Sequence, residues 1–212
     1  MQNCQENDNA EHHPDERRTD GSFPDESLPN ISRKIHSGNL ILVGMMGSGK
    51  TTMGRALARH LGKSFVDSDE EIIKRTGVTV PHIFDIEGES GFRLRETATI
   101  HDLVGRENSV LATGGGAVLT ERNRAMLQQN GIVIYIKASV HDLWQRTKHD
   151  RNRPLLQAGD PHAKLNELFQ QRDPLYLQVS DIVVQSGKQS VHALMLQLAD
   201  KIEEFRKNYH QG

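Results

Sequence analysis

Residues 44–51 read Gly-Met-Met-Gly-Ser-Gly-Lys-Thr, and this stretch decides the fold. It follows an apolar run at 40–43 and leads directly into an amphipathic stretch that begins at Lys50. A G-x-x-x-x-G-K-[ST] pattern between a buried strand and a helix is typical of a loop whose backbone N–H groups surround a phosphate. In such a loop Lys50 reaches the outer phosphates and Thr51 offers its hydroxyl to Mg²⁺. The alternative is a plain glycine-rich turn, which has no use for Lys50 and Thr51 at this spacing.

The rest of the chain alternates short apolar runs with longer amphipathic stretches. We expect strands at residues 40–43, 64–66, 110–112, 132–136 and 182–184. We expect helices at residues 50–61, 69–75, 91–104, 121–129, 140–148, 165–177 and 190–205. Strands that alternate with helices predict an α/β fold with a parallel sheet and right-handed crossovers.

The charge balance excludes a general nucleic-acid binder. The 212 residues carry 26 Lys+Arg against 28 Asp+Glu, a formal charge of −2, and lack the basic excess that polyanions attract. The longest apolar runs are far shorter than the ~20 residues of a membrane-spanning helix. A single cysteine, Cys4, and an N-terminus without an apolar signal core indicate a cytoplasmic protein. We expect a monomer that binds neither nucleic acid nor membrane.

Residues 1–37 differ in composition from the rest. They hold eight acids against four bases, three prolines and few large apolar side chains. Such a segment buries too little surface to offset the entropy cost of ordering it. We therefore predict a disordered acidic extension at 1–37 and one folded domain at 38–212.

Two carboxylates, Asp67 and Asp69, follow the second expected strand. Ligands of open parallel sheets bind at the carboxyl ends of strands, and residues two apart in extended chain point the same way. One carboxylate can hold water on Mg²⁺ while the other orients or deprotonates an attacking hydroxyl. The third strand runs into Thr113 and three glycines without a carboxylate, which favours Asp67 for the metal. The alternative for Asp69 is a helix N-cap.

Two arginines are candidates for binding an anionic substrate. Arg93 can clamp a carboxylate or phosphate with its planar fork, or it can form an ordinary helix pair with Glu96. Its neighbour Phe92 fits a core position. Arg172 can likewise contact an anion or form a salt bridge with Asp173.

Two glycine-bearing loops are candidates for the remaining contacts. Residues 114–116 are three glycines after a buried strand, which offer backbone N–H groups and close approach to a ligand; a bare turn is the alternative. Residues 150–161 carry Arg151 and Arg153 between two expected helices. They predict a lid that neutralises the transferred phosphoryl group, against the alternative of a solvated surface loop. The eleven histidines show no zinc-ligand spacing.

The motifs resemble the shikimate kinase family when they are taken in order. They are Gly-x-Met-Gly-Ser-Gly-Lys-Thr-Thr-Met-Gly (44–54), Asp-Ser-Asp (67–69), Gly-Phe-Arg-x-x-Glu (91–96), Ala-Thr-Gly-Gly-Gly (112–116), Arg-Pro-Leu-Leu (153–156) and Arg-Asp-Pro-Leu-Tyr (172–176). The resemblance extends from about residue 40 to the last helix. It implies a P-loop fold of the nucleoside-monophosphate-kinase type with a five-stranded parallel sheet. The implied reaction transfers the γ-phosphoryl group of ATP, with Mg²⁺, to the 3-hydroxyl group of shikimate.

The resemblance also implies roles for individual residues. Asp69, Lys50 and Arg153 would be catalytic, and Thr51 and Asp67 would serve the metal. ATP would be bound by Gly47, Ser48, Gly49, Lys50, Thr51, Thr52, Arg153 and Gln189. Shikimate would be bound by Asp69, Arg93, Gly115 and Arg172, with the two arginines on its carboxylate. The acidic extension at 1–37 has no counterpart in the family.

Two alternatives stay open at this point. A kinase for another polyol acid such as gluconate shares the phosphate loop and an arginine clamp. A non-catalytic nucleotide-binding module descended from a kinase is a different class, and loss of Lys50, Asp69 or the lid arginine would favour it. All three are present.

Overall fold

The computed structural model describes residues 31–148, 160–187 and 189–210. Within these ranges the strands are β1 (Leu40–Val43), β2 (Ser64–Asp67), β3 (Ser109–Ala112), β4 (Ile132–Lys137) and β5 (Ile182–Gln185). The helices are α1 (Ile31–His36), α2 (Lys50–Leu61), α3 (Ser68–Thr76), α4 (Val80–Val104), α5 (Glu121–Asn130), α6 (Val140–Thr147), α7 (Pro161–Val179) and α8 (Val191–His210), with a short 3₁₀ turn η1 (Ala117–Leu119).

The strands form one parallel sheet in the order β2-β3-β1-β4-β5. β1 lies at the centre and is buried along its whole length, which explains why its sequence is apolar without alternation. The register pairs Leu42 with Ala112 and Ile134, so the first residues after β1 and β3 emerge at the same edge. The α/β fold and the parallel sheet expected from the sequence are confirmed.

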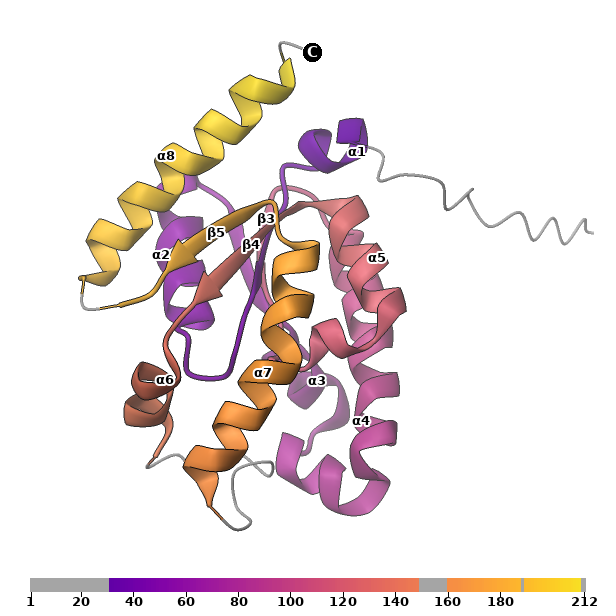
Figure 1. Cartoon of the computed structure of the whole chain (residues 1–212). Coiled ribbons are helices and arrows are strands. Elements are labelled where there is room, and N and C mark those ends of the chain that lie inside the picture. The colour runs from indigo at the N-terminus through magenta and orange to yellow at the C-terminus, as the bar shows by residue number, and fades with distance from the viewer. Residues whose placement is uncertain (1–30, 149–159, 188, 211–212) are drawn as a thin grey trace, which may run out of the picture.

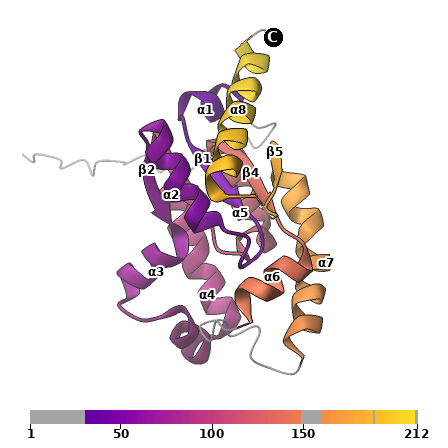
Figure 2. The same cartoon turned by 90° about the vertical axis from the view of Figure 1, so that its left-hand side faces the viewer.

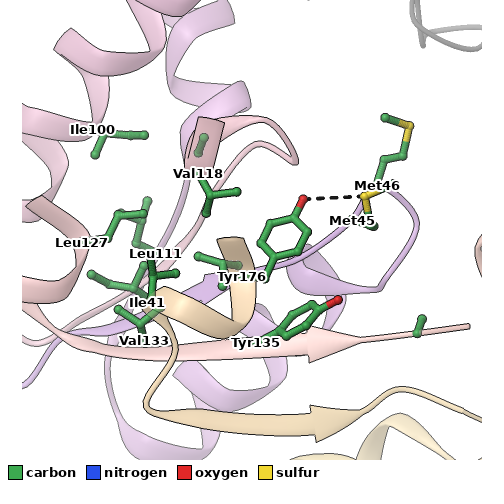
Figure 3. Close-up of a cluster of buried hydrophobic side chains, with 14 of the residues drawn as sticks. Ile41, Met45, Met46, Ile100, Leu111, Val118, Leu127, Val133, Tyr135 and Tyr176 are labelled. Atoms are coloured by element: carbon green, nitrogen blue, oxygen red, sulfur yellow. Dashed lines mark hydrogen bonds between the residues drawn. The ribbon is translucent and has the colours of Figure 1, made fainter. Parts of the chain in front are cut away.

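Helices cover both faces of the sheet (Figure 1). On one face, α2 and α8 pack on the even-numbered residues of β1 and β4, such as Leu42 and Ile134. On the other face, α4, α5 and α7 pack on the odd-numbered ones, including Ile41 and Tyr135, as Figure 3 shows. Figure 2 shows the same layers from the side of α2 and α8. No helix in the described part of the chain is long and apolar enough to cross a membrane.

A third, smaller core lies apart from the sheet. Ile72 of α3 packs there with Ile83 and Phe92 of α4, and the rings of Phe84 and Phe92 lie 4.8 Å apart. Helix α4 begins at Val80, eleven residues before the start that its sequence predicts. The break is at Gly88, where φ is 69° and ψ is −177°, a conformation that glycine adopts without steric cost.

The structure moves the boundary of the folded domain. The sequence predicts disorder through residue 37, but residues 31–36 form α1 on the domain. Lys34 is 6% exposed, and its ammonium group lies 2.6 Å from the carboxylate of Asp181 at the start of β5. Asp181 also accepts from the N–H of Val133 at 2.7 Å. The ion pair therefore ties α1 to two strands, a long-range contact that composition does not predict.

Replacing Lys34 should destabilise the protein. Lys34→Met leaves the carboxylate of Asp181 largely buried without its ammonium partner, which we expect to lower the free energy of unfolding by about 1–3 kcal/mol. Urea denaturation measures the change. Lys207→Met is the control, because Lys207 and Glu203 are 75% and 71% exposed and such pairs contribute ~0–1 kcal/mol. Equal losses in the two variants would show that the α1 contact does not stabilise the fold.

Candidate active site

A cavity of about 350 Å³ lies at the carboxyl ends of the strands. Its walls are the loop after β1, the acidic pair at the end of β2 and the start of α3, the glycine loop (residues 114–116) after β3, and one arginine of α6. The candidate residues that line it are Gly47, Gly49, Lys50, Thr51, Thr52, Asp67, Asp69 and Gly115. The structure thus brings the phosphate loop and the acidic pair together, at the edge where open parallel sheets bind ligands.

The loop after β1 curls around its own lysine. The ammonium group of Lys50 donates to the carbonyl oxygens of Gly44 at 2.8 Å and Met45 at 2.9 Å, and Lys50 is 8% exposed. Gly47 and Gly49 have φ values of 76° and 97°, in the left-handed region that favours glycine. This backbone conformation lets the loop turn and lead directly into α2. Ser48 is buried within the loop. This arrangement holds one positive charge and a helix N-terminus at one end of the cavity.

Thr51 and Asp67 form a pair of oxygen ligands beside the loop. The hydroxyl of Thr51 donates to Asp67 Oδ2 at 2.8 Å, which leaves the lone pairs of the Thr51 oxygen available. Asp67 Oδ1 accepts the backbone N–H groups of Asp69 at 3.0 Å and Glu70 at 3.4 Å. Hard oxygen donors in small number suit Mg²⁺, which keeps several waters and binds substrate phosphates as well. The donor set therefore fits magnesium.

Asp69 is not the N-cap of α3. The cap is Asp67, two residues earlier, and Asp69 lies in the first helical turn with its side chain on the cavity. The capping alternative for Asp69 is thereby removed, since the cap is already supplied. A carboxylate in the first turn also interacts favourably with the helix dipole.

A second carboxylate, Glu96 of α4, lies beside Asp69. A Cβ at Gly114 would meet Glu96 Oε1 at 2.6 Å and Asp69 Oδ1 at 2.7 Å, so both oxygens border one small space. Glu96 is fully buried, and burial raises its pKa although Arg93 counteracts part of the effect. From its sequence, Glu96 is expected as a possible helix partner of Arg93 and as the last residue of the motif at 91–96. The structure makes it part of the wall behind Asp69.

Arg93 is held by two carboxylates of its own helix. Its guanidinium contacts Glu96 Oε2 at 2.7 Å and Glu89 Oε1 at 2.8 Å. Burial by itself lowers the pKa of Arg93, but the two carboxylates outweigh it and raise the pKa overall. A Cβ at Gly116 would overlap the guanidinium, so Arg93 lies directly on the glycine loop. The helix pair that the sequence allowed is present, and it places the arginine at the site.

Arg172 of α7 reaches the same glycine loop from the other side. It is 2% exposed, and its Nη1 donates to the carbonyl of Gly115 at 3.2 Å. The hydroxyl of Tyr176, one turn further along α7, donates to the same carbonyl. Burial lowers the pKa of Arg172. Among the described residues no carboxylate forms an ion pair with it; Asp173, the partner considered from the sequence, contacts β4 instead.

Three of the cavity's residues were not expected from the sequence: Met46, Thr113 and Arg146. Arg146 of α6 donates to the carbonyl of Gly47 at 3.3 Å and to Ser186 Oγ at 3.0 Å, which ties the phosphate loop to the loop after β5. No motif marks Arg146, because its sequence context is that of an ordinary solvated base on an amphipathic helix. Met46 and Thr113 lie inside sequence motifs, but site roles were predicted there only for the glycines, the hydroxyl groups of the phosphate loop and the charged residues.

Ser48 and Gln189 are expected ATP contacts that do not line the cavity. Gln189 is exposed and donates to the carbonyl of Gln185 at 3.1 Å, and it is not among the residues that line the cavity. Arg153 and the rest of residues 149–159, which hold most of the expected lid, lie outside the described residues.

The phosphate loop and the acidic pair share one cavity of a parallel sheet, and Arg93 and Arg172 lie on the glycine loop that borders it. These features define a P-loop phosphotransferase that acts on a small anionic molecule. A sequence model described as shikimate kinase matches residues 46–203. The shikimate kinase of Nitrosospira multiformis is 60% identical over 166 residues, which cover 78% of this chain and 85% of the relative. The chain belongs to the shikimate kinase family.

Solved structures agree with this assignment. The shikimate kinase of Acinetobacter baumannii, solved in complex with shikimate, is 45% identical with a TM-score of 0.77 and is covered over 95% of its length by 84% of this chain. The shikimate kinase of Aquifex aeolicus is 32% identical with a TM-score of 0.69, with 78% of this chain and 96% of that one covered. The predicted family, fold class and enzyme class are confirmed.

A methyl group at Gly114 should reduce activity while leaving the fold intact. The backbone at Gly114 is open to alanine, but the new Cβ would displace the carboxylates of Asp69 and Glu96. Side-chain ends can move at little cost in stability, whereas misplacing a reacting group by about 1 Å costs up to ~10²-fold in rate. We expect Gly114→Ala to lower kcat about 10- to 100-fold with an unchanged Tm.

Gly105→Ala at the end of α4 is the control, because a Cβ there lies no nearer than 3.5 Å to its surroundings. Steady-state kinetics and thermal melts of both variants check the expectation. Full activity in Gly114→Ala would mean that the two carboxylates are not held as close as described.

Proposed function

We propose which residues at this cavity bind ATP, Mg²⁺ and shikimate, and which residue acts on the reacting hydroxyl group. The reaction is the ATP-dependent phosphorylation of shikimate at its 3-hydroxyl group, which gives shikimate 3-phosphate and ADP, a step of aromatic amino-acid biosynthesis. One observation carries the division: Arg172 is a buried guanidinium without an ion-pair partner among the described residues, on the glycine loop that borders the cavity. Burying a charge without a counter-ion costs free energy. An anionic substrate would supply the counter-ion of Arg172.

The phosphate end of the cavity binds ATP. Residues 47–52 surround the phosphates with backbone N–H groups, and phosphate oxygens replace the carbonyls of Gly44 and Met45 as acceptors for Lys50. Arg146 adds a positive charge at the outer wall of the loop. Arg153 and Gln189 stay predictions for the same nucleotide.

The hydroxyl of Thr51 and, through water, the carboxylate of Asp67 would hold Mg²⁺. When bound, the ion would supply positive charge to the transferred phosphoryl group. Asp67 supports this role by accepting the hydrogen bond that the Thr51 hydroxyl donates. The lone pairs of the Thr51 oxygen then remain available to a metal ion. No group of three or more His, Cys, Asp or Glu side chains suited to a metal lies in the described ranges.

The other end of the cavity binds shikimate. Arg93 and Arg172 flank the glycine loop and grip the carboxylate with planar forks. The N–H of Gly115 donates to a ring hydroxyl. Asp69 accepts the proton of the 3-hydroxyl group or orients that group toward the γ-phosphorus, because it lies on the cavity between the phosphate loop and the glycine loop.

A coupled ADP-release assay tests this proposal. Shikimate, quinate, gluconate and no acceptor are compared at equal concentration with ATP and Mg²⁺. Shikimate should give by far the highest kcat/KM, since two arginines, one acceptor and one backbone donor are fixed on a rigid wall. Gluconate presents a carboxylate and hydroxyls on an open chain, so a preference for gluconate would overturn the assignment. ADP release that is independent of every acceptor would favour a nucleotide-binding module.

We also propose that the enzyme is a cytoplasmic monomer. Its co-substrate ATP and its single cysteine support the location. Light scattering coupled to size-exclusion chromatography measures the oligomeric state directly.

A further inference from the structure

Asp173 of α7 is bound by two side chains from the end of β4. Its Oδ1 accepts from the hydroxyl of Tyr135 at 2.6 Å, and its Oδ2 accepts from the ammonium group of Lys137 at 2.9 Å. Tyr135 is fully buried, and the side chains of Lys137 and Asp173 are 26% and 18% exposed. Each carboxylate oxygen thus has its own donor in a sheltered position, where charge-assisted hydrogen bonds are strong.

The two partners come from one face of one strand. Tyr135 and Lys137 are two residues apart in β4, so their side chains point to the same side of the sheet, toward α7. The ring of Tyr135 also packs on the ring of Tyr176 at 4.9 Å, as Figure 3 shows. Burial and the bond to Asp173 raise the pKa of Tyr135, so its hydroxyl remains a donor.

Arg172 and Asp173 are neighbours that point in different directions. Successive residues of an α-helix are about 100° apart around its axis, and Arg172 shares its side of the helix with Tyr176, four residues on. Both of these donate to the carbonyl of Gly115, while Asp173 meets β4. Fixing Asp173 therefore fixes the rotation of α7 and the direction of Arg172.

The backbone of α7 lacks one hydrogen bond close to Asp173. Pro174 lies inside the helix, and proline has no N–H to donate to the carbonyl four residues earlier. The ladder is therefore incomplete at the turn that carries Arg172. A side-chain anchor next to the proline restores the lost constraint.

We propose that Asp173 is a positioning residue, which Tyr135 and Lys137 hold so that Arg172 faces the substrate carboxylate. The inference rests on the proposed assignment of Arg172 to shikimate. Asp173 does not touch the substrate. Its bonds to β4 also occupy the carboxylate nearest in sequence to Arg172, which keeps the guanidinium available for an anion from outside.

The first test is Asp173→Ala. Alanine favours the helix, so the variant removes the side-chain anchor to β4 and introduces no residue that breaks helices. Shikimate binding to the free enzyme, measured by calorimetry without nucleotide, should weaken ~10-fold or more, since a small displacement of a clamping group has effects of this size. The KM for ATP should stay within about twofold. Glu167→Gln is the matched control on α7, because Glu167 is 64% exposed and pairs only with Lys164 in the described structure.

A second pair of variants separates positioning from folding. Lys137→Met removes the charged donor, whereas Lys137→Arg keeps it, so the first should lose shikimate affinity and the second should retain most of it. This pair also carries the test if Asp173→Ala does not fold. Shikimate affinity within twofold of the wild type in Lys137→Met overturns the proposal, as does an equal loss for shikimate and ATP. Failure of the wild type to bind shikimate contradicts the proposed function instead.

Discussion

Asp69→Asn should lower kcat/KM for shikimate by ~10²–10⁴-fold, the range of a general base or an orienting acceptor. The variant keeps the size of the side chain but loses the charge that accepts or orients the hydroxyl proton. Nucleotide binding should survive, because the phosphate loop is untouched. The change cannot act through helix capping, since the N-cap of α3 is Asp67. A kcat/KM within threefold of wild type would remove Asp69 from the mechanism.

Asp67→Asn is the matched comparison, two residues away in the same turn. Asparagine is about as good an N-cap as aspartate, so the Tm should change little. The variant loses the charge that we propose supports Mg²⁺ binding, so a higher Mg²⁺ concentration should recover part of the activity. Asp69→Asn should show no such recovery. Kinetics over a magnesium titration distinguish the two carboxylates, and the same response in both variants would contradict the division of roles.

Arg172→Lys should raise the KM for shikimate by at least about 30-fold, since truncating a buried charge partner costs ~2–5 kcal/mol. Lysine keeps the charge but loses the planar fork. Burial already lowers the pKa of Arg172, and the same burial disfavours a charged ammonium group at this position. The KM for ATP should remain near the wild-type value.

Arg95→Lys is the control for this prediction, because Arg95 is 44% exposed and pairs with Glu87 on the surface. Arg93→Lys should also raise the KM for shikimate, as Arg172→Lys does. At position 93, however, the new ammonium group can still pair with the carboxylates of Glu89 and Glu96. A rise in the KM for ATP with normal shikimate affinity would contradict the assignment of Arg172 to shikimate.

The strands were predictable to within one residue because each is a short apolar run with a sharp polar or glycine boundary. The phosphate loop and the acidic pair were predictable because their spacing has a chemical reason. The helical segment before Gly88 was missed, since its sequence, with Pro81 and scattered charges, has no clear periodicity. Helix α1 was missed because tertiary contacts hold it, among them a buried ion pair between residues 147 positions apart. Arg146 was missed because only tertiary contacts distinguish it from solvated bases.

The separate small core of Ile72, Ile83 and Phe92 has a consequence for local unfolding. A unit that shares little apolar surface with the main sheet can open at a lower free energy than the whole molecule. Amide hydrogens of the first half of α4 should then exchange by sub-global opening, while those of β1 exchange only on global unfolding. Phe92 belongs to this unit and Arg93 follows it directly, so binding the substrate carboxylate would also protect these amides from exchange.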